Sequence, residues 1–209
     1  MTEPSARATF IETVVPGLIH WSLDDDRIGS RTHCYGIKTD QETILIDPLP
    51  LAVMVEHLLE DVTTICLTGR FHQRSAWRYQ EKFDAQVYAP EKGKGYEGTP
   101  DHFYEADDIL PGGLQVIHAP GPTDAHYVFY LDHEGEKVMF IADLLTRQSG
   151  DDYFKFVPGE YMDNPDITRE SVRMLLDYPI DILCPNHGNP VIGDVHEALE
   201  EALEKDEGR

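Results

Sequence analysis

The strongest constraint on the fold is a short apolar run that ends abruptly in a polar turn. The stretch Ile65–Ser75 has the sequence ICLTGRFHQRS, which is typical of a buried strand leading into a helix. In α/β proteins, ligands often bind at the carboxyl ends of strands, because side chains and helix N-termini converge there. The sequence therefore predicts a ligand-binding turn that carries a histidine and two arginines.

Three more turns of this kind follow along the chain. They are Ala119–Thr123 (APGPT), Phe140–Asp143 (FIAD) and Leu183–Gly188 (LCPNHG). Two blocks of strands, each followed by helices, predict a mixed α/β protein with two packed sheets and helices outside. Because the four turns lie at strand ends, we expect a functional site assembled from several loops.

The local patterns predict the following elements. Hairpins are expected around Pro16-Gly17 and around Thr39–Glu42, with a loop at Ser22–Arg31 between them. Helices are expected at Leu51–Leu59, Ser75–Phe83, Ile167–Leu176 and Val195–Lys205, with Asp166 near an N-cap. Further strands are expected at Thr63–Leu67, Ala85–Ala89, Gly113–His118, His126–Asp132, Lys137–Ile141 and Ile180–Cys184. Pro90–Pro111 is expected to be an irregular insertion, and Thr146–Pro165 a loop that either lines a substrate lid or covers the core.

The motifs, taken in order, resemble those of the metallo-β-lactamase superfamily. They are an apolar strand ending in Asp, the His-bearing turn, a Pro-Gly turn, an Ala-Asp pair and a final His turn, at Ile44–Asp47, Thr68–Ser75, Ala119–Thr123, Ala142-Asp143 and Pro185–Gly188. The resemblance implies an α/β (α+β) fold, the four-layer αββα sandwich. We expect a single domain over residues 1–209.

The departures from the family pattern bear directly on function. In the motif Thr-His-x-His-x-Asp-His, His72 takes the place of the middle His. Other ligand positions hold Arg70 for the first His, Arg74 for the Asp, Ser75 for the last His and Pro122 for the His of the Pro-Gly turn. The remaining ligands are His72, Asp143 and His187, and His126 is a candidate fourth ligand.

The resemblance implies metal chemistry in a degenerate site. One zinc, iron or manganese ion on His72, Asp143 and His187 would suit hydrolysis of an ester, thioester or lactone. Arg70 or Arg74 would then stabilise an oxyanion or orient an anionic substrate. Alternatively, no metal binds, and Arg70 and Arg74 hold an anionic small molecule. A third reading is a structural protein whose arginines pair with Asp47 and Asp143.

The charge balance limits the partners. With 39 acidic and 17 basic residues, the net charge is −22, so we expect neither nucleic acid nor an anionic membrane surface to bind. Such a charge suits a high-salt interior, which predicts a halophilic protein; the alternative is an ordinarily acidic cytosolic protein. Three cysteines without Cys-x-x-Cys spacing predict reduced, buried thiols. Without an apolar segment of signal-peptide or membrane-spanning length, we expect a cytoplasmic protein.

Overall fold

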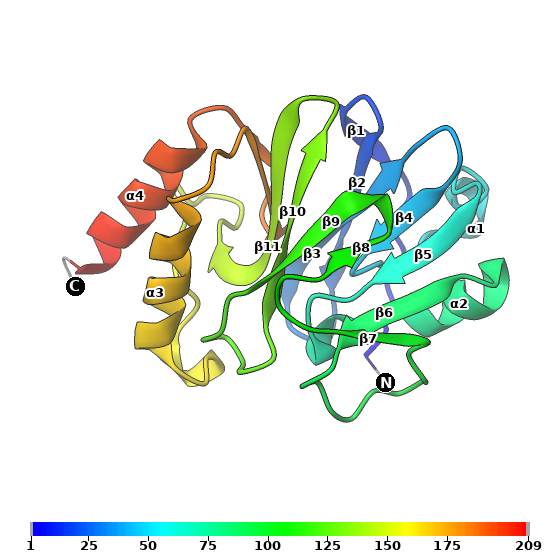
Figure 1. Ribbon diagram of the computed structural model, residues 1–209, viewed down its shortest axis with the longest axis horizontal. Helices are drawn as coiled ribbons and strands as arrows, with labels where there is room; N and C mark the ends of the chain where they lie inside the picture. Colours follow the sequence, from blue (N-terminus) through cyan, green and yellow to red (C-terminus); the bar gives the residue numbers. More distant parts are fainter. Residues whose placement is uncertain (1, 208–209) are drawn as a thin grey trace. The chain divides into compact units, whose positions relative to one another are not determined.

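The strands form two sheets in the computed structural model, which describes residues 2–207 (Figure 1). Each sheet belongs to one of two compact units. The first unit comprises the described residues up to Glu105 together with Leu110–Gly112. The second comprises Ala106–Ile109 and the described residues from Gly113 onwards.

The sheet of the first unit has seven strands in sequential order. Strands β1 to β4 pair antiparallel, and β4 to β7 pair parallel. The bounds are β1 (Glu12–Val15), β2 (Leu18–Asp25), β3 (Ser30–Lys38), β4 (Thr43–Ile46), β5 (Val62–Cys66), β6 (Gln86–Pro90) and β7 (His102–Tyr104). The helical segments are α1 (Val53–Glu56), η1 (Arg70–His72) and α2 (Ala76–Phe83). The His-bearing turn therefore leaves the carboxyl end of a parallel strand, as the sequence predicts.

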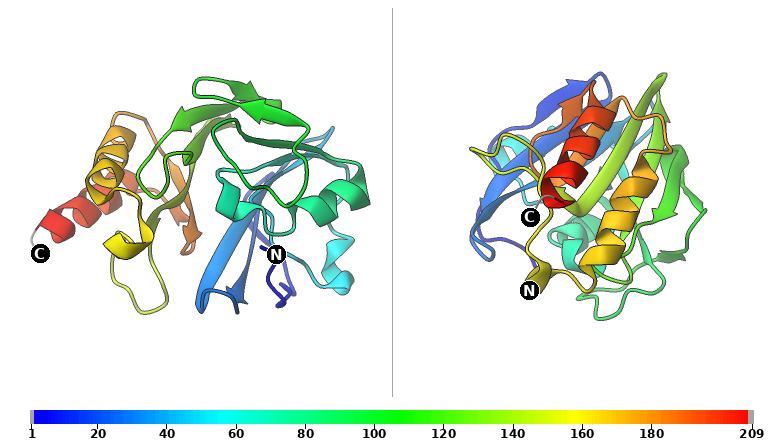
Figure 2. Two further views of the ribbon diagram at one scale, coloured as in Figure 1. Left: turned by 90° about the horizontal axis from the view of Figure 1, so that it is seen from below. Right: turned by 90° about the vertical axis from the view of Figure 1, so that its left-hand side faces the viewer.

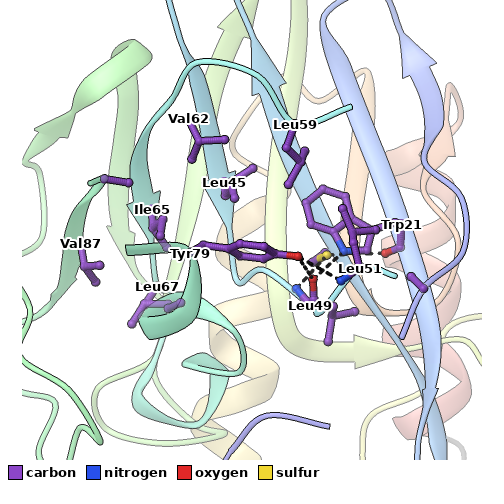
Figure 3. Packing of buried hydrophobic residues seen from close by; sticks show 14 of the residues in the cluster. Trp21, Leu45, Leu49, Leu51, Leu59, Val62, Ile65, Leu67, Tyr79 and Val87 are labelled. Atoms are coloured by element: carbon purple, nitrogen blue, oxygen red, sulfur yellow. Dashed lines mark hydrogen bonds between the residues drawn. The ribbon is translucent and has the colours of Figure 1, made fainter. Parts of the chain in front are cut away.

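The core of this unit gathers around Trp21 and Tyr79, which are fully buried. The Trp21 indole and the Tyr79 hydroxyl both donate hydrogen bonds to the Leu49 carbonyl, at 2.9 and 3.1 Å (Figure 3). The Tyr79 hydroxyl in turn accepts a hydrogen bond from the Leu51 N–H at 3.0 Å. These bonds satisfy the backbone of the segment after β4 within an apolar core, where an unpaired polar group would be costly. They fix the segment that follows Asp47.

Two expected elements of this unit are wrong. The Ser22–Arg31 loop is mostly strand, because β2 and β3 continue their pairing to Asp25 and Ser30 and only a short turn separates them. The expected helix at Leu51–Leu59 shrinks to α1, whose Val53 and Met54 are exposed. Helical spacing of apolar residues does not ensure a helix where too few turns form to offset the cost of nucleation.

The sheet of the second unit has six strands in the order β13-β12-β11-β10-β9-β8. Strands β8 (Ile109–Leu110), β9 (Leu114–His118), β10 (Tyr127–His133), β11 (Glu136–Thr146), β12 (Ile182–His187) and β13 (Val191–Ile192) contribute, with short segments η2 (Pro111–Gly113) and η3 (Gly159–Tyr161). Only the β11–β12 pair is described as parallel. Helices α3 (Pro165–Leu175) and α4 (Val195–Glu207) lie side by side (Figures 1 and 2).

Apolar side chains of α3 and α4 pack on the sheet in the second core, which includes Val172, Leu199 and Met139. The Thr146–Pro165 segment contributes Phe154 to this core, with 1% of its surface exposed. Its first half is also tied back on itself by paired backbone hydrogen bonds between Thr146 and Lys155. The segment thus covers the core, the second of the two roles expected for it.

Three further boundaries differ from expectation. The insertion expected to be irregular contains β7 and β8, short strands that add to existing sheet edges. Helix α3 is capped by Asn164 rather than Asp166, because the Asn164 side chain accepts bonds from the first free N–H groups and Pro165 takes the N1 position. Strand β11 extends past Ile141 to Thr146, so Asp143 lies within a strand.

Candidate functional site

Asp47 links the ends of two neighbouring parallel strands, β4 and β5. Its carboxylate is fully buried and accepts hydrogen bonds from the Thr68 N–H at 2.8 Å and the Thr68 hydroxyl at 2.6 Å. Its backbone takes a φ of 49°, a left-handed conformation that aspartate tolerates better than most residues. Burial raises the pKa of Asp47, but the positive charges of His72 and Arg74 and the Thr68 bond outweigh it and hold the pKa below its ordinary value.

His72 lies on η1 and is 5% exposed. Its Nδ1 atom is 2.7 Å from the Thr68 hydroxyl oxygen and 3.3 Å from an Asp47 carboxylate oxygen. Since the Thr68 hydroxyl gives its proton to Asp47, it must accept from the Nδ1–H of His72. The network therefore places a proton on Nδ1 and fixes the orientation of the ring. A histidine ring held through Nδ1 in this way is an arrangement found among metal ligands.

Arg74 lies in the interior, which fits the structural one of the two roles considered for it from the sequence. It is 4% exposed and has a φ of 38°. One guanidinium nitrogen donates to the carbonyls of His33 at 3.0 Å and Asp47 at 3.1 Å, and the other donates to the Thr32 hydroxyl at 2.8 Å. These bonds tie β3 to the end of β4, so the donors are already used inside the unit.

Arg70 differs sharply from Arg74. Its side chain is exposed, and its guanidinium lies 4.3 Å from the centre of the Phe71 ring. Among residues 2–207, no carboxylate lies within salt-bridge distance of this guanidinium. Other arginines of this acidic chain do have acidic partners, namely Arg7, Arg27, Arg31, Arg78 and Arg169. The cation that replaces the first His is therefore available to an external anion.

Asp143 and His187 come together in the second unit. The carboxylate lies 3.3 Å from His187 Nε2, and the two side chains are 28% and 14% exposed. Two features of the backbone place them there. The β11–β12 pairing shifts register around Ala142, whose φ is 48°, and β12 continues past Pro185 to His187. The two side chains thus form a partly accessible contact, which is an ion pair only when His187 is protonated.

His126 has a positioning role that argues against the metal-ligand role expected for it. Its Nδ1 lies 2.8 Å from the Ala119 carbonyl, so Nδ1 carries the proton and donates it. Its Nε2 then accepts the Asp143 N–H at 3.2 Å. Binding a metal through Nε2 would break the second bond. The 2% exposed ring instead holds the Ala142-Asp143 turn against the Pro-Gly turn.

The Pro-Gly turn packs on the start of α3. A side chain at Gly121 would meet Thr168 backbone atoms at 2.4–2.5 Å, and its φ of 129° also favours glycine. The Gly121 and Pro122 carbonyls accept bonds from the N–H groups of Asn164 and Asp163. In the family pattern this turn carries a metal ligand. In this chain it supports the start of α3 instead.

A family model for the metallo-beta-lactamase superfamily matches residues 68–187, more than half of the chain. The match begins at the His72 turn and ends at His187. The chain belongs to the metallo-β-lactamase superfamily. The turns described above are therefore the superfamily's metal-binding turns in altered form.

Solved structures show the same fold. A metallo-beta-lactamase from Pontibacter korlensis aligns with a TM-score of 0.77 and 16% identity over 96% of this chain and 99% of that chain. A metallo-beta-lactamase family protein from Thermus thermophilus aligns at 0.70 and 20%, over 94% and 81% of the two chains. A flavo di-iron protein mutant from Thermotoga maritima aligns at 0.74 and 15%, over 95% and 62%. Identities this low show the metallo-β-lactamase fold alone. A search of curated proteins finds no match.

The two-metal centre of the superfamily does not fit these residues. Four of its ligand positions are engaged otherwise or are cationic: Arg70, Arg74, Ser75, whose hydroxyl donates to Glu3 at 2.8 Å, and Pro122. Within the described part of the chain, no group of three or more His, Cys, Asp or Glu side chains is arranged to hold a metal ion. No helix among the described residues is long and apolar enough to span a membrane.

Sequence reasoning missed two residues that shape the first turn. Thr68 is the first residue of the His-bearing motif, and the sequence assigns it no further role. In the structure its hydroxyl makes the hydrogen bond that orients the His72 ring. Gln73 is 2% exposed, and its side-chain N–H donates to the Arg70 carbonyl at 2.8 Å. Glutamine between two arginines has no sequence signature, whereas a threonine directly after an apolar strand is a recognisable capping position.

Proposed function

We propose that this protein binds a small anionic molecule through Arg70, in a turn that other members of the superfamily use for metal. One observation carries the proposal: the Arg70 guanidinium is exposed and has no carboxylate partner among the described residues, in a chain of 39 acidic residues. Guanidinium binds carboxylate and phosphate by two parallel hydrogen bonds. Arg74 supports the turn from the interior, because its buried hydrogen bonds join β3 to the end of β4.

The test is a calorimetric titration of the purified chain with inorganic phosphate and with succinate, in a buffer free of both. Arg70→Gln should abolish the binding heat, since it keeps size and polarity but removes the charge. Arg7→Gln is the matched control, because Arg7 is an exposed arginine that already pairs with Glu3. Equal binding by wild type and Arg70→Gln would contradict the proposal.

Metal-dependent hydrolysis of an ester, thioester or lactone is the second candidate. The observation in its favour is the way His72 is held, because Thr68 and Asp47 fix its Nδ1 as supporting groups fix the second nitrogen of metal-ligating histidines. His72, Asp143 and His187 would be the ligands of one zinc, iron or manganese ion. Mass spectrometric metal analysis after reconstitution tests this, with a His72→Ala/His187→Ala double variant as control. About one ion per chain in the wild type and none in the variant would favour hydrolysis.

The net charge supports a small-molecule partner over nucleic acid or an anionic membrane, and it supports a high-salt interior. Three buried cysteines support a reducing, cytoplasmic setting. A thermal melt in dilute buffer and in molar KCl tests the halophilic part. The melting temperature should rise with salt, because salt screens the mutual repulsion of the carboxylates. Equal melting temperatures in both would count against it.

A further inference from the structure

The segment Glu91–Gly98 is fixed beside Arg70 by a network around Gln73. The buried Gln73 side-chain oxygen accepts hydrogen bonds from the Trp77 indole at 3.0 Å and the Glu97 N–H at 2.6 Å. The same side chain donates to the Arg70 carbonyl. One amide thus joins three segments: η1, the helix α2 and the loop after β6. The loop is preorganised rather than free to collapse.

Close glycine packing fixes the loop further. A side chain at Gly98 would lie 2.5 Å from the Trp77 ring, and one at Gly93 would lie 2.0 Å from the Tyr96 hydroxyl. The Tyr96 hydroxyl donates to the Pro90 carbonyl at 3.1 Å, and its ring meets Trp77 edge-on at 6.4 Å. The loop therefore lies tightly on α2 and passes Arg70, since a side chain at Gly95 would lie 3.9 Å from an Arg70 guanidinium nitrogen.

The Glu91–Gly98 loop carries two lysines and two glutamates, so its formal charges balance. Lys92 and Lys94 are exposed on either side of Gly93, and no carboxylate among residues 2–207 lies within salt-bridge distance of either ammonium group. The same loop carries the exposed acids Glu91 and Glu97. At the scale of the whole molecule, a net charge of −22 repels anions. An anion would therefore gain most from direct contact with Arg70 and Lys94.

An exposed aromatic ring accompanies these cations. Phe71 is 54% exposed, and the guanidinium of Arg70 stacks over it. Stacking holds the planar cation by its face and leaves its N–H edge to bind an anion. An exposed phenylalanine ring gains from covering by another apolar group. Charge and ring are thus presented side by side.

We propose that Arg70, Phe71 and Lys94 form a preformed site for an anion attached to an aromatic ring, such as an aryl phosphate or an aryl carboxylate. Arg70 and Lys94 bind the anionic group, Phe71 contacts the ring, and Gln73 is a positioning residue that holds the Glu91–Gly98 loop beside them. This inference rests on the proposed function and names the ligand class of the same site.

The test compares phenyl phosphate with inorganic phosphate in calorimetric titrations of the full chain. Phenyl phosphate should bind roughly 3- to 10-fold more tightly, the gain expected from one aromatic contact. Phe71→Leu should remove that gain, so the readout is the ratio of the two affinities, which should fall to about 1 even if the lost stacking on Arg70 weakens both probes. The matched control is Phe10→Leu, because Phe10 is 48% exposed and no cation is described as stacking on it. Both side chains are about half exposed, so we expect the substitutions to change the free energy of unfolding only slightly.

The outcomes separate the two proposals. If both probes bind through Arg70 with equal affinity, anion binding stands and the aromatic specificity is overturned. If neither probe binds, the proposed function itself fails. If the gain for phenyl phosphate survives in Phe71→Leu, or is lost equally in Phe10→Leu, the assignment of the ring contact to Phe71 is overturned.

Discussion

The two histidines that remain from the superfamily's metal-binding turns lie in very different surroundings. His72 is buried in a closed network in which its Nδ1 faces Thr68 and Asp47. His187 is half-buried, and its Nε2 lies 3.3 Å from an Asp143 carboxylate oxygen. The first turn also contains Arg74, a buried cation whose guanidinium donates to backbone carbonyls.

The difference shows that a histidine in a ligand position can serve either the stability of the fold or the binding of a ligand. In the first turn, removing a member of the network disrupts hydrogen bonds between buried polar groups, so His72 contributes to the stability of the fold. In the second region, the contact between Asp143 and His187 is partly solvated and contributes little to stability. A contribution of His187 to binding is therefore easier to separate from folding than one of His72.

Arg74→Leu should have the largest effect on this contrast. Without the guanidinium, the His33 and Asp47 carbonyls lose their hydrogen-bond donor. The buried Asp47 carboxylate also loses a nearby positive charge. We expect the free energy of unfolding to fall by about 3–5 kcal/mol. Urea denaturation measures it, with Arg70→Leu as the paired control, which should change stability by less than about 0.5 kcal/mol. Equal losses in the two variants would contradict the interior role of Arg74.

Asp47→Asn should rank second. Near neutral pH we expect a loss of about 1–3 kcal/mol, because the amide cannot accept from both Thr68 donors and compensate Arg74 as well. The pKa of Asp47 in the folded state is lowered from its ordinary value of 3.8. Its ionised form therefore stabilises the fold above that pH, and this contribution is lost as the pH falls through the lowered pKa. Unfolding curves measured from pH 7 to pH 2 should show the variant and the wild type converging at the acid end.

Asp143→Asn should change stability by less than about 1 kcal/mol, because a partly exposed pair is screened by solvent. A double-mutant cycle with His187→Gln measures the coupling directly. A coupling energy well above 1 kcal/mol would show that the second region is as closed as the first, and the contrast between the regions would disappear.

Ala142→Gly should have the smallest effect. A φ of 48° strains alanine, and glycine relieves that strain. Glycine also loses the buried methyl contact and makes the unfolded chain more flexible, so the terms oppose each other. We expect a net change within about 1 kcal/mol by thermal melting. A much larger loss would mean that the methyl group, rather than the turn, holds Asp143 in place.

Much of the fold could be predicted from sequence because its turns have residue-specific causes. The backbone has few allowed conformations at the Pro-Gly pair of Gly121. An apolar strand followed by Thr68 likewise indicates where a strand ends and a turn begins. The short helix α1 and the far end of the β2–β3 hairpin were not predictable in this way. Helix α1 forms too few turns to follow its apolar spacing, and the polar residues around Asp25 and Ser30 lack the β-branched and aromatic residues typical of strands. The sequence also does not predict which of the two arginines is buried. Arg70 and Arg74 are the same residue four positions apart, and only tertiary hydrogen bonds make one interior and the other exposed.

The three cysteines have a practical consequence for spectroscopy. Cys34, Cys66 and Cys184 are buried, and burial raises the pKa of each thiol, so they should resist alkylating dyes under native conditions. A single new cysteine at an exposed position such as Ile192, which is 60% exposed, would be the one reactive thiol on the folded chain. Fluorophores could then be attached at chosen places without first removing the native sulfhydryls.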